Sequence, residues 1–337
     1  MSEEFKEVTE EIQNAEVTGE SLGEADDAEN VIGADENEFA AAAGEYSEPK
    51  KTGQVGAYLY GLLVILVLVI AQSAIQMIGL YPIMQRCLAA SGGDVDKYQQ
   101  LYLAEIASSP AVQFSTLFGS LFMLIIAAVW YFFKYYRPAK EEGRIEPLLP
   151  RLKKPMAIVT IVAGCICAFG LAVVIQCLLS GFIPDTSEMV NELLGDVIGT
   201  NIMGVIAAVI VAPIAEELAV RGIILRRAER SFGLVGCMII SAVMFGVFHL
   251  NIIQGLYVLP MGLFWGYIGY KYKSVIPCII CHMLNNLFSV VTGGIDIHSL
   301  STILIFLGVA IVSGAVTFLM IKKENSANAE ELTETVG

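Results

Sequence analysis

Long apolar segments, separated by short polar and charged stretches, make up most of the chain from residue 53 onward. Each is close to the length of about 20 residues that a helix needs to cross a bilayer core of about 30 Å. The expected spans are 56–80, 112–133, 156–180, 199–225, 234–250, 253–271, 274–292 and 299–321. The pattern therefore predicts an all-α fold, a polytopic membrane protein with about eight transmembrane helices.

The spans and the polar stretches divide the chain into four expected regions. Residues 1–52 are an acidic disordered tail, 53–198 hold transmembrane helices 1–3 with their loops, 199–322 form a core of helices 4–8, and 323–337 are a disordered C-terminal tail. Residues 1–49 contain sixteen Asp and Glu but one basic residue, Lys6. A segment of this composition buries too little apolar surface to offset the entropy of ordering, so we expect disorder there.

Composition supports a location in the membrane and excludes other classes. Of the 337 residues 55% are hydrophobic and 16% are charged, against about 25% charged in soluble domains. Six of the seven cysteines fall in the expected spans, which argues against a secreted disulfide framework. Basic residues stand at span ends, so we expect contact with membrane lipid and no nucleic-acid binding.

Basic residues also predict the orientation. Four segments that alternate correctly to lie on one side carry them: seven in 134–154, three in 226–230, two in 271–273 and two in 322–323. Cytoplasmic loops are enriched in Lys and Arg. We therefore expect an integral protein of the plasma membrane with both termini in the cytoplasm.

Several polar residues lie where lipid or protein interior is expected, and buried ionisable groups in membranes mark functional sites by default. They are Glu216, Glu217, Arg221, His249, His282 and Asn286. Glu216 lies about 16 residues before the turn expected near Phe232, and His249 about 16 residues after it, so both reach a similar height on an antiparallel pair. His282 is expected about 12 Å deep and Glu216 about 14 Å deep.

Helical spacing separates these residues into pairs. Glu217 and Arg221 stand at i and i+4 with the acid first, the favourable order for an ion pair. Glu216 is left without that partner, so Glu217 and Arg221 are interpreted as support and Glu216 as the reactive carboxylate. Phe245 with His249, and His282 with Asn286, each share one helix face.

Two kinds of hydrolytic chemistry fit this set. A buried carboxylate is a better proton acceptor than one in water, so Glu216 and His249 could activate a water molecule. His282 and Asn286 would then supply hydrogen-bond donors to the oxyanion. Alternatively, Glu216, His249 and His282 could bind a catalytic zinc ion with water in the fourth position. The sequence leaves both open, and no other cofactor is indicated.

The three motifs together resemble the CPBP intramembrane proteases. They are Glu216-Glu217-x-x-x-Arg221, Phe245-x-x-x-His249 and His282-x-x-x-Asn286, in this order on successive apolar helices, and the resemblance covers residues of about 200 to 290. This family includes the CAAX prenyl endoproteases and bacterial proteins linked to bacteriocin processing and self-immunity. The resemblance implies that Glu216 and His249 activate water and that His282 and Asn286 hold the oxyanion. Val220 departs from the aromatic residue frequent before the Arg.

The sequence thus predicts an intramembrane endopeptidase, of glutamate or metalloprotease type, that cleaves a membrane-associated or lipidated protein or peptide. One alternative is a catalytically silent bacteriocin-immunity or scaffold protein, in which the charges only clamp helices. A proton-coupled carrier is a further alternative, because carriers also bury Glu and His.

Overall fold

The computed structural model describes residues 53–145, 147–152, 155–182, 202–291 and 299–336. Within these ranges every regular element is a helix, which confirms the all-α class. The chain divides into two units, Met1–Lys50 and Lys51–Gly337, and the described residues belong to the second. The acidic tail expected at residues 1–52 lies outside the described residues.

Five helical stretches are long and apolar enough to cross a membrane. They are Gln54–Ser91 (α3), Pro110–Glu141 (α5, Pro110–Tyr131; η1, Phe132–Tyr136; α6, Arg137–Glu141), Pro155–Phe182 (α8), Ile202–Ala228 and Leu300–Ala327. Two shorter apolar helices are α13 (Leu234–Phe248) and α16 (Ile276–Val291). An integral membrane protein follows, but among the described residues five helices, not the expected eight, reach full spanning length.

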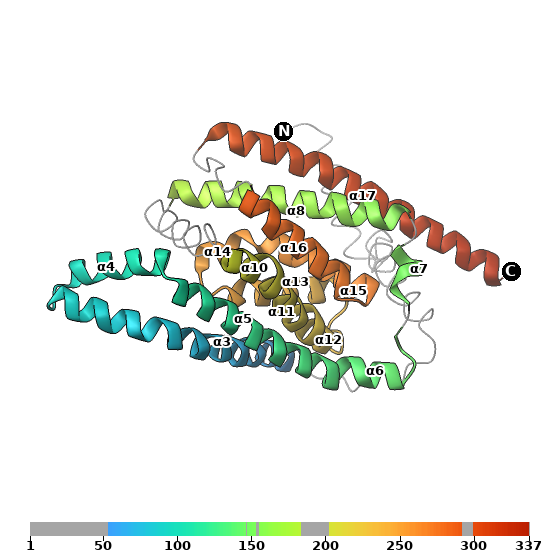
Figure 1. Ribbon diagram of the computed structural model, residues 1–337. Coiled ribbons are helices and arrows are strands. Elements are labelled where there is room, and N and C mark those ends of the chain that lie inside the picture. Colours follow the sequence, from blue (N-terminus) through green and yellow to red (C-terminus); the bar gives the residue numbers. More distant parts are fainter. Residues whose placement is uncertain (1–52, 146, 153–154, 183–201, 292–298, 337) are drawn as a thin grey trace, which may run out of the picture. The chain divides into compact units, whose positions relative to one another are not determined.

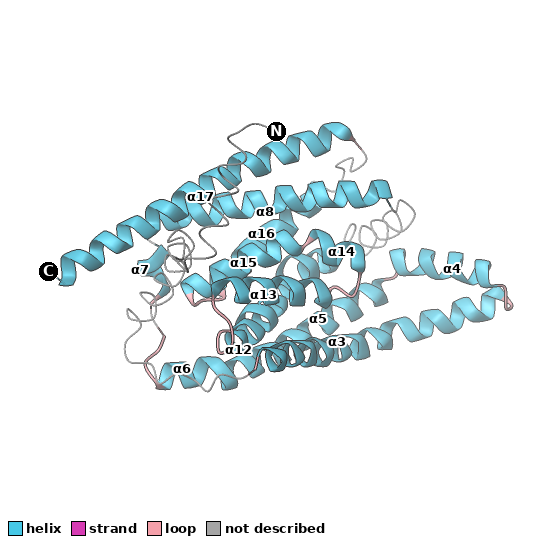
Figure 2. Ribbon diagram, turned by 180° about the vertical axis from the view of Figure 1, so that it is seen from behind, coloured by secondary structure: helices cyan, strands magenta, loops and turns pink. Residues whose placement is uncertain are grey.

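Helices from both ends of the sequence flank those that carry Glu216, Glu217 and His282 (Figures 1 and 2). On one side α3 packs along α5, and α4 (Val95–Ser108) folds back on α3. On the other side α8 packs along α17 (Leu300–Val336), and the short α7 (Leu148–Leu152) precedes α8. The segments from α10 to α16 lie between these two pairs and contact α5 and α8.

The stretch Ile202–Ala228 is one helical run with two wide turns. It consists of α10 (Ile202–Ile206), the π-helical η2 (Ala207–Val211), α11 (Ala212–Glu217), the π-helical η3 (Leu218–Ile224) and α12 (Leu225–Ala228). Glu216 and Glu217 end the α-helical turn between the two π segments. Such π segments occur frequently at functional sites because they re-aim side chains and carbonyl groups.

A break in the chain replaces the single span expected at 253–271. The structure has α14 (Ile252–Tyr257) and α15 (Leu259–Tyr272), with Pro260 in the first turn of α15. Proline favours a helix start because it has no N–H to donate and its φ is fixed. Asn251 begins α14, since its side-chain oxygen accepts hydrogen bonds from the N–H groups of Ile253 and Gln254. His249 therefore lies at a chain reversal between helices.

The C-terminal helix is also longer than the sequence suggests. Helix α17 continues to Val336, so the disordered tail expected at 323–337 is wrong for residues 323–336. Glu324 is buried and forms an ion pair with Lys271 of α15 at 2.7 Å. This pair gives the end of the apolar helix a partner in the core, which the charge pattern of the tail alone does not reveal.

Candidate active site

The expected ion pair between Glu217 and Arg221 is present and fully buried. The Arg221 Nη1 donates to Glu217 Oε1 at 2.8 Å, and both side chains are fully buried at 0% exposure. Arg221 Nη2 also donates to the Gly262 carbonyl at 3.2 Å, where the Ser241 hydroxyl donates as well. Buried charges persist only when they are paired and hydrogen-bonded, so this cluster fixes α15 against the Glu217 helix.

Two aromatic rings enclose the Arg221 guanidinium. Its central carbon lies 4.8 Å from the centroid of the Phe245 ring and 5.5 Å from that of Trp265. Trp265 also lies against His282, with ring centroids 4.7 Å apart. No motif in the sequence points to Trp265, because its role comes from a tertiary contact of α15.

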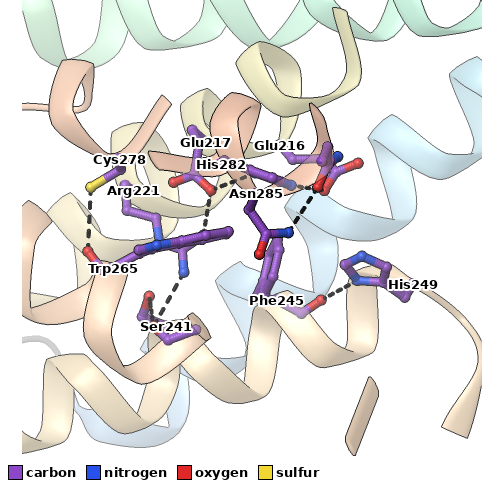
Figure 3. A network of polar contacts seen from close by, with 12 residues as sticks. Glu216, Glu217, Arg221, Ser241, Phe245, His249, Trp265, Cys278, His282 and Asn285 are labelled. Carbon is purple, nitrogen blue, oxygen red and sulfur yellow. Dashed lines mark hydrogen bonds and ion pairs between the residues drawn. The ribbon is translucent and has the colours of Figure 1, made fainter. Parts of the chain in front are cut away.

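His282 lies between the two glutamates (Figure 3). Its Nδ1 is 3.0 Å from Glu217 Oε1, and its Nε2 is 3.9 Å from Glu216 Oε2. An ionised carboxylate only accepts hydrogen bonds, so the Glu217 contact places a proton on Nδ1. The nitrogen left for chemistry is Nε2, which faces Glu216.

His249 is oriented in a similar way by a backbone carbonyl. Its Nδ1 is 2.8 Å from the Phe245 oxygen, and because a carbonyl only accepts, Nδ1 donates and Nε2 is the accepting nitrogen. The Phe245 ring lies 4.9 Å from the His249 ring and 5.4 Å from the His282 ring, centroid to centroid. In the described residues no hydrogen bond or ion pair joins His249 directly to Glu216.

Asn286 contacts the other wide turn. Its amide nitrogen donates to the Ala208 carbonyl in η2 at 2.9 Å, and its oxygen accepts from Asn285 at 3.1 Å. The expected shared face with His282 is thus present along α16, but one amide hydrogen of Asn286 is committed to Ala208. Asn285, which the motif does not include, holds the amide of Asn286 in this orientation.

One carboxylate oxygen of Glu216 is buried without a hydrogen-bond partner among the described residues. This oxygen is Oε2, and the side chain as a whole keeps 15% exposure. Leaving a buried carboxylate oxygen without a donor costs about 1–3 kcal/mol or more. A partly exposed carboxylate with an oxygen that lacks a donor is suited to receive a proton or a polar reactant.

A catalytic zinc ion needs three ligating side chains around one point. Among the described residues no group of three or more His, Cys, Asp or Glu side chains is arranged to hold a metal ion. The zinc site of Glu216, His249 and His282 that the sequence left open stays a prediction. Their donor atoms are arranged as separate hydrogen-bonding groups.

The comparison with family models agrees with this region. Residues 198–288 match the model described as type II CAAX prenyl endopeptidase Rce1-like. No curated protein and no solved structure matches the chain. The match includes all three motifs and confirms the resemblance: residues 198–288 of this membrane protein are similar to the Rce1-like type II CAAX prenyl endopeptidases.

Proposed function

We propose that this protein hydrolyses a peptide bond of a membrane-associated or lipidated substrate within the bilayer, with Glu216 as the proton acceptor. The observation that carries the proposal is the position of Glu216. Its Oε2 is buried without a donor among the described residues and lies 3.9 Å from His282 Nε2, whereas the neighbouring Glu217 is fully buried and its Oε1 accepts from both Arg221 and His282.

The first step is attack of water on the substrate carbonyl. Glu216 takes a proton as the new carbon–oxygen bond forms, and His249 Nε2 is the second acceptor that can orient the same water. The Nδ1 contacts with Phe245 and Glu217 hold both imidazoles in fixed tautomers. General base catalysis of this kind contributes about 10²–10⁴-fold to a rate.

The second step needs donors for the oxyanion and a proton for the leaving amine. Asn286 has one amide hydrogen beyond the one bound by Ala208, and His282 can donate from Nε2 when it is protonated there. The carbon–nitrogen bond then breaks as Glu216 returns its proton to the leaving nitrogen. Removal of a single oxyanion donor in other hydrolases costs about 10²–10³-fold in kcat.

The test is cleavage of a prenylated reporter peptide with a CAAX-type C-terminus by the purified protein in detergent. Glu216→Gln keeps size and polarity but cannot take the proton, so we expect kcat to fall at least 10²-fold. The thermal unfolding temperature should stay unchanged, because Glu216 has no ion pair with a base that is always charged. Full activity of folded Glu216→Gln would overturn the proposal.

The same assay separates the alternatives. Loss of activity on treatment with a chelator, restored by Zn²⁺, would favour the metalloprotease type over the glutamate type. An immunity or scaffold protein would bind its partner equally well as wild type and as Glu216→Gln. A proton-coupled carrier would show uptake into proteoliposomes that depends on a pH gradient.

A further inference from the structure

Two glycines meet where α13 and α14 cross, close to His249. Gly246 precedes His249 by three residues on α13, and Gly255 lies in α14. A Cβ atom on Gly246 would lie 2.8 Å from the Gly255 carbonyl oxygen, and one on Gly255 would lie 3.1 Å from the Gly246 carbonyl oxygen. Both obstacles are backbone atoms, which cannot rotate away, so a Cβ on Gly246 would force the helices apart and a Cβ on Gly255 would need a shift of a few tenths of an ångström.

The same Gly246 carbonyl belongs to the backbone that holds His249. It accepts the His249 backbone N–H at 3.3 Å, while the preceding carbonyl, of Phe245, accepts the ring Nδ1–H at 2.8 Å. Two successive carbonyls of α13 therefore fix the backbone and the ring of this histidine. Gly255 packs directly against the Gly246 carbonyl group.

The connection between the two helices is short and leaves little room for adjustment. Leu250 adopts a left-handed conformation with φ 53°, which is strained for a residue with a branched side chain. Asn251 then caps α14 with its side chain, and its carbonyl accepts the Gly255 N–H at 2.7 Å. Leu250 and Asn251 are the only residues between His249 and α14, so His249 stands next to the link through which a shift of α14 would reach α13.

We propose that the contact between Gly246 and Gly255 positions the His249 imidazole, and that Gly255, which lies outside the three motifs, is a positioning residue for the reaction. The consequence for catalysis rests on the proposed function, in which His249 orients the water. The structural part does not: a larger residue at position 255 would move the carbonyl group that His249 binds.

The kinetic test compares alanine variants in the reporter cleavage assay. Misplacement of a catalytic group by about 1 Å can cost about 10²-fold in rate. We expect Gly255→Ala to lower kcat about tenfold with KM changed less than about twofold, and Gly246→Ala, with its closer contact, to lower kcat about 10²-fold. If Gly246→Ala does not fold, Gly255→Ala alone decides, because its contact of 3.1 Å needs a shift of only a few tenths of an ångström.

A matched control lies between α8 and α17, away from His249. A Cβ on Gly170 would meet the Phe306 carbonyl oxygen at 3.0 Å, a backbone contact of the same kind, whereas one on Gly308 would meet nothing within 4 Å. Gly170→Ala should lower the unfolding temperature but leave kcat per folded molecule unchanged, and Gly308→Ala should change neither. An equal fall in kcat for Gly170→Ala and Gly255→Ala would contradict a positioning role.

A spectroscopic measurement keeps this inference independent of activity. The chain has three histidines, so imidazole ¹⁵N labelling gives three ring systems, and His249→Gln assigns one of them. We expect the His249 Nδ1 resonance to shift in Gly255→Ala and to stay in place in Gly170→Ala. An unchanged resonance in folded Gly255→Ala would overturn the inference, even if wild type cleaved no peptide; a shifted one alongside an inactive wild type would leave the geometry standing and overturn only the proposed reaction.

Discussion

Glu217 shows how one side chain can serve structure and chemistry through different partners. The same oxygen, Oε1, accepts from Arg221 at 2.8 Å and from His282 at 3.0 Å. It compensates a fully buried guanidinium and at the same time determines which nitrogen of His282 carries the proton. Glu216, one residue earlier, has neither duty, which leaves it free to exchange a proton.

Glu217→Gln is therefore expected to destabilise the protein. Removing one partner of a buried pair leaves the other charge uncompensated, which costs about 3–5 kcal/mol. The free energy of unfolding in mixed detergent micelles measures this loss. Glu141→Gln is the matched control, because Glu141 pairs with Arg137 at 2.7 Å but their side chains are 62% and 57% exposed. We expect no measurable change there, and equal stability of both variants would contradict the structural role of Glu217.

Sequence spacing predicts contacts within one helix of the candidate site better than contacts between helices. Spacing predicts the pairs Glu217 with Arg221 and Phe245 with His249, because neighbours at i and i+4 share a helix face whatever the fold. Spacing cannot predict Trp265 against His282, or Gly262 beneath Arg221, since these depend on how α15 approaches. It also missed that Asn286 binds Ala208, because the wide turn of η2 is a feature of the folded helix.

At the scale of elements, hydrophobicity predicts where apolar segments lie but not which of them form a single spanning helix. Asn251, just before the predicted span 253–271, caps α14, and Pro260 within the span stands in the first turn of α15. The continuous apolar run hides both signals, so hydrophobicity predicts one helix where there are two. Helix α13 has 15 residues, or about 22 Å, which is shorter than the bilayer core. Reversal after such a short helix is what brings His249 to the level of the glutamates.

Helix α17 provides a prediction about the C-terminal region. Lys271 donates to Glu324 at 2.7 Å and to the Tyr267 hydroxyl at 2.9 Å, so it fixes α17 against α15. Glu324→Ala should release the end of α17 and raise the rate of trypsin cleavage after Lys323 about tenfold, because proteolysis follows the population of the opened segment.

The charge-swapped double variant is the control for this helix. Lys271→Glu combined with Glu324→Lys restores an ion pair across the same two positions. Because the lysine at position 324 adds a trypsin site, this comparison uses a protease that does not cut after lysine on wild type and both variants, and we expect cleavage of the end of α17 to return close to the wild-type rate. If Glu324→Ala is cleaved no faster than wild type, the ion pair does not hold α17 in place.

For the whole molecule, the structure adds spatial evidence to the charge pattern along the sequence. Arg226 of α12 donates to the Gly269 carbonyl of α15 at 2.9 Å, and Lys273 pairs with Glu229 at 3.2 Å. Together with the pair between Lys271 and Glu324, these contacts bring three of the four basic segments to one end of the described helices.

The fourth basic segment lies at the same end. The Tyr135 hydroxyl, next to Lys134, donates to the Tyr60 hydroxyl near the start of α3 at 3.2 Å, and the Arg227 guanidinium lies 5.9 Å from the centroid of the Tyr60 ring. A shared end is required if all four segments are to face the cytoplasm, and it would be absent if the helices alternated differently. By the excess of Lys and Arg, we predict that this end is cytoplasmic.

Cysteine labelling in intact cells tests that orientation. Asp96 and Lys140 are both exposed. Asp96 lies in the first turn of α4, which precedes the span α5–α6, and Lys140 lies in α6 at the end of that span. A membrane-impermeant maleimide should label Asp96→Cys in intact cells and Lys140→Cys only after permeabilisation. The unsubstituted protein gives the background, since its seven cysteines are buried or partly buried.

The reverse labelling would invert the orientation, and labelling of both in intact cells would mean that the two ends do not lie on opposite sides of the membrane. Either result would contradict a cytoplasmic location of the basic end.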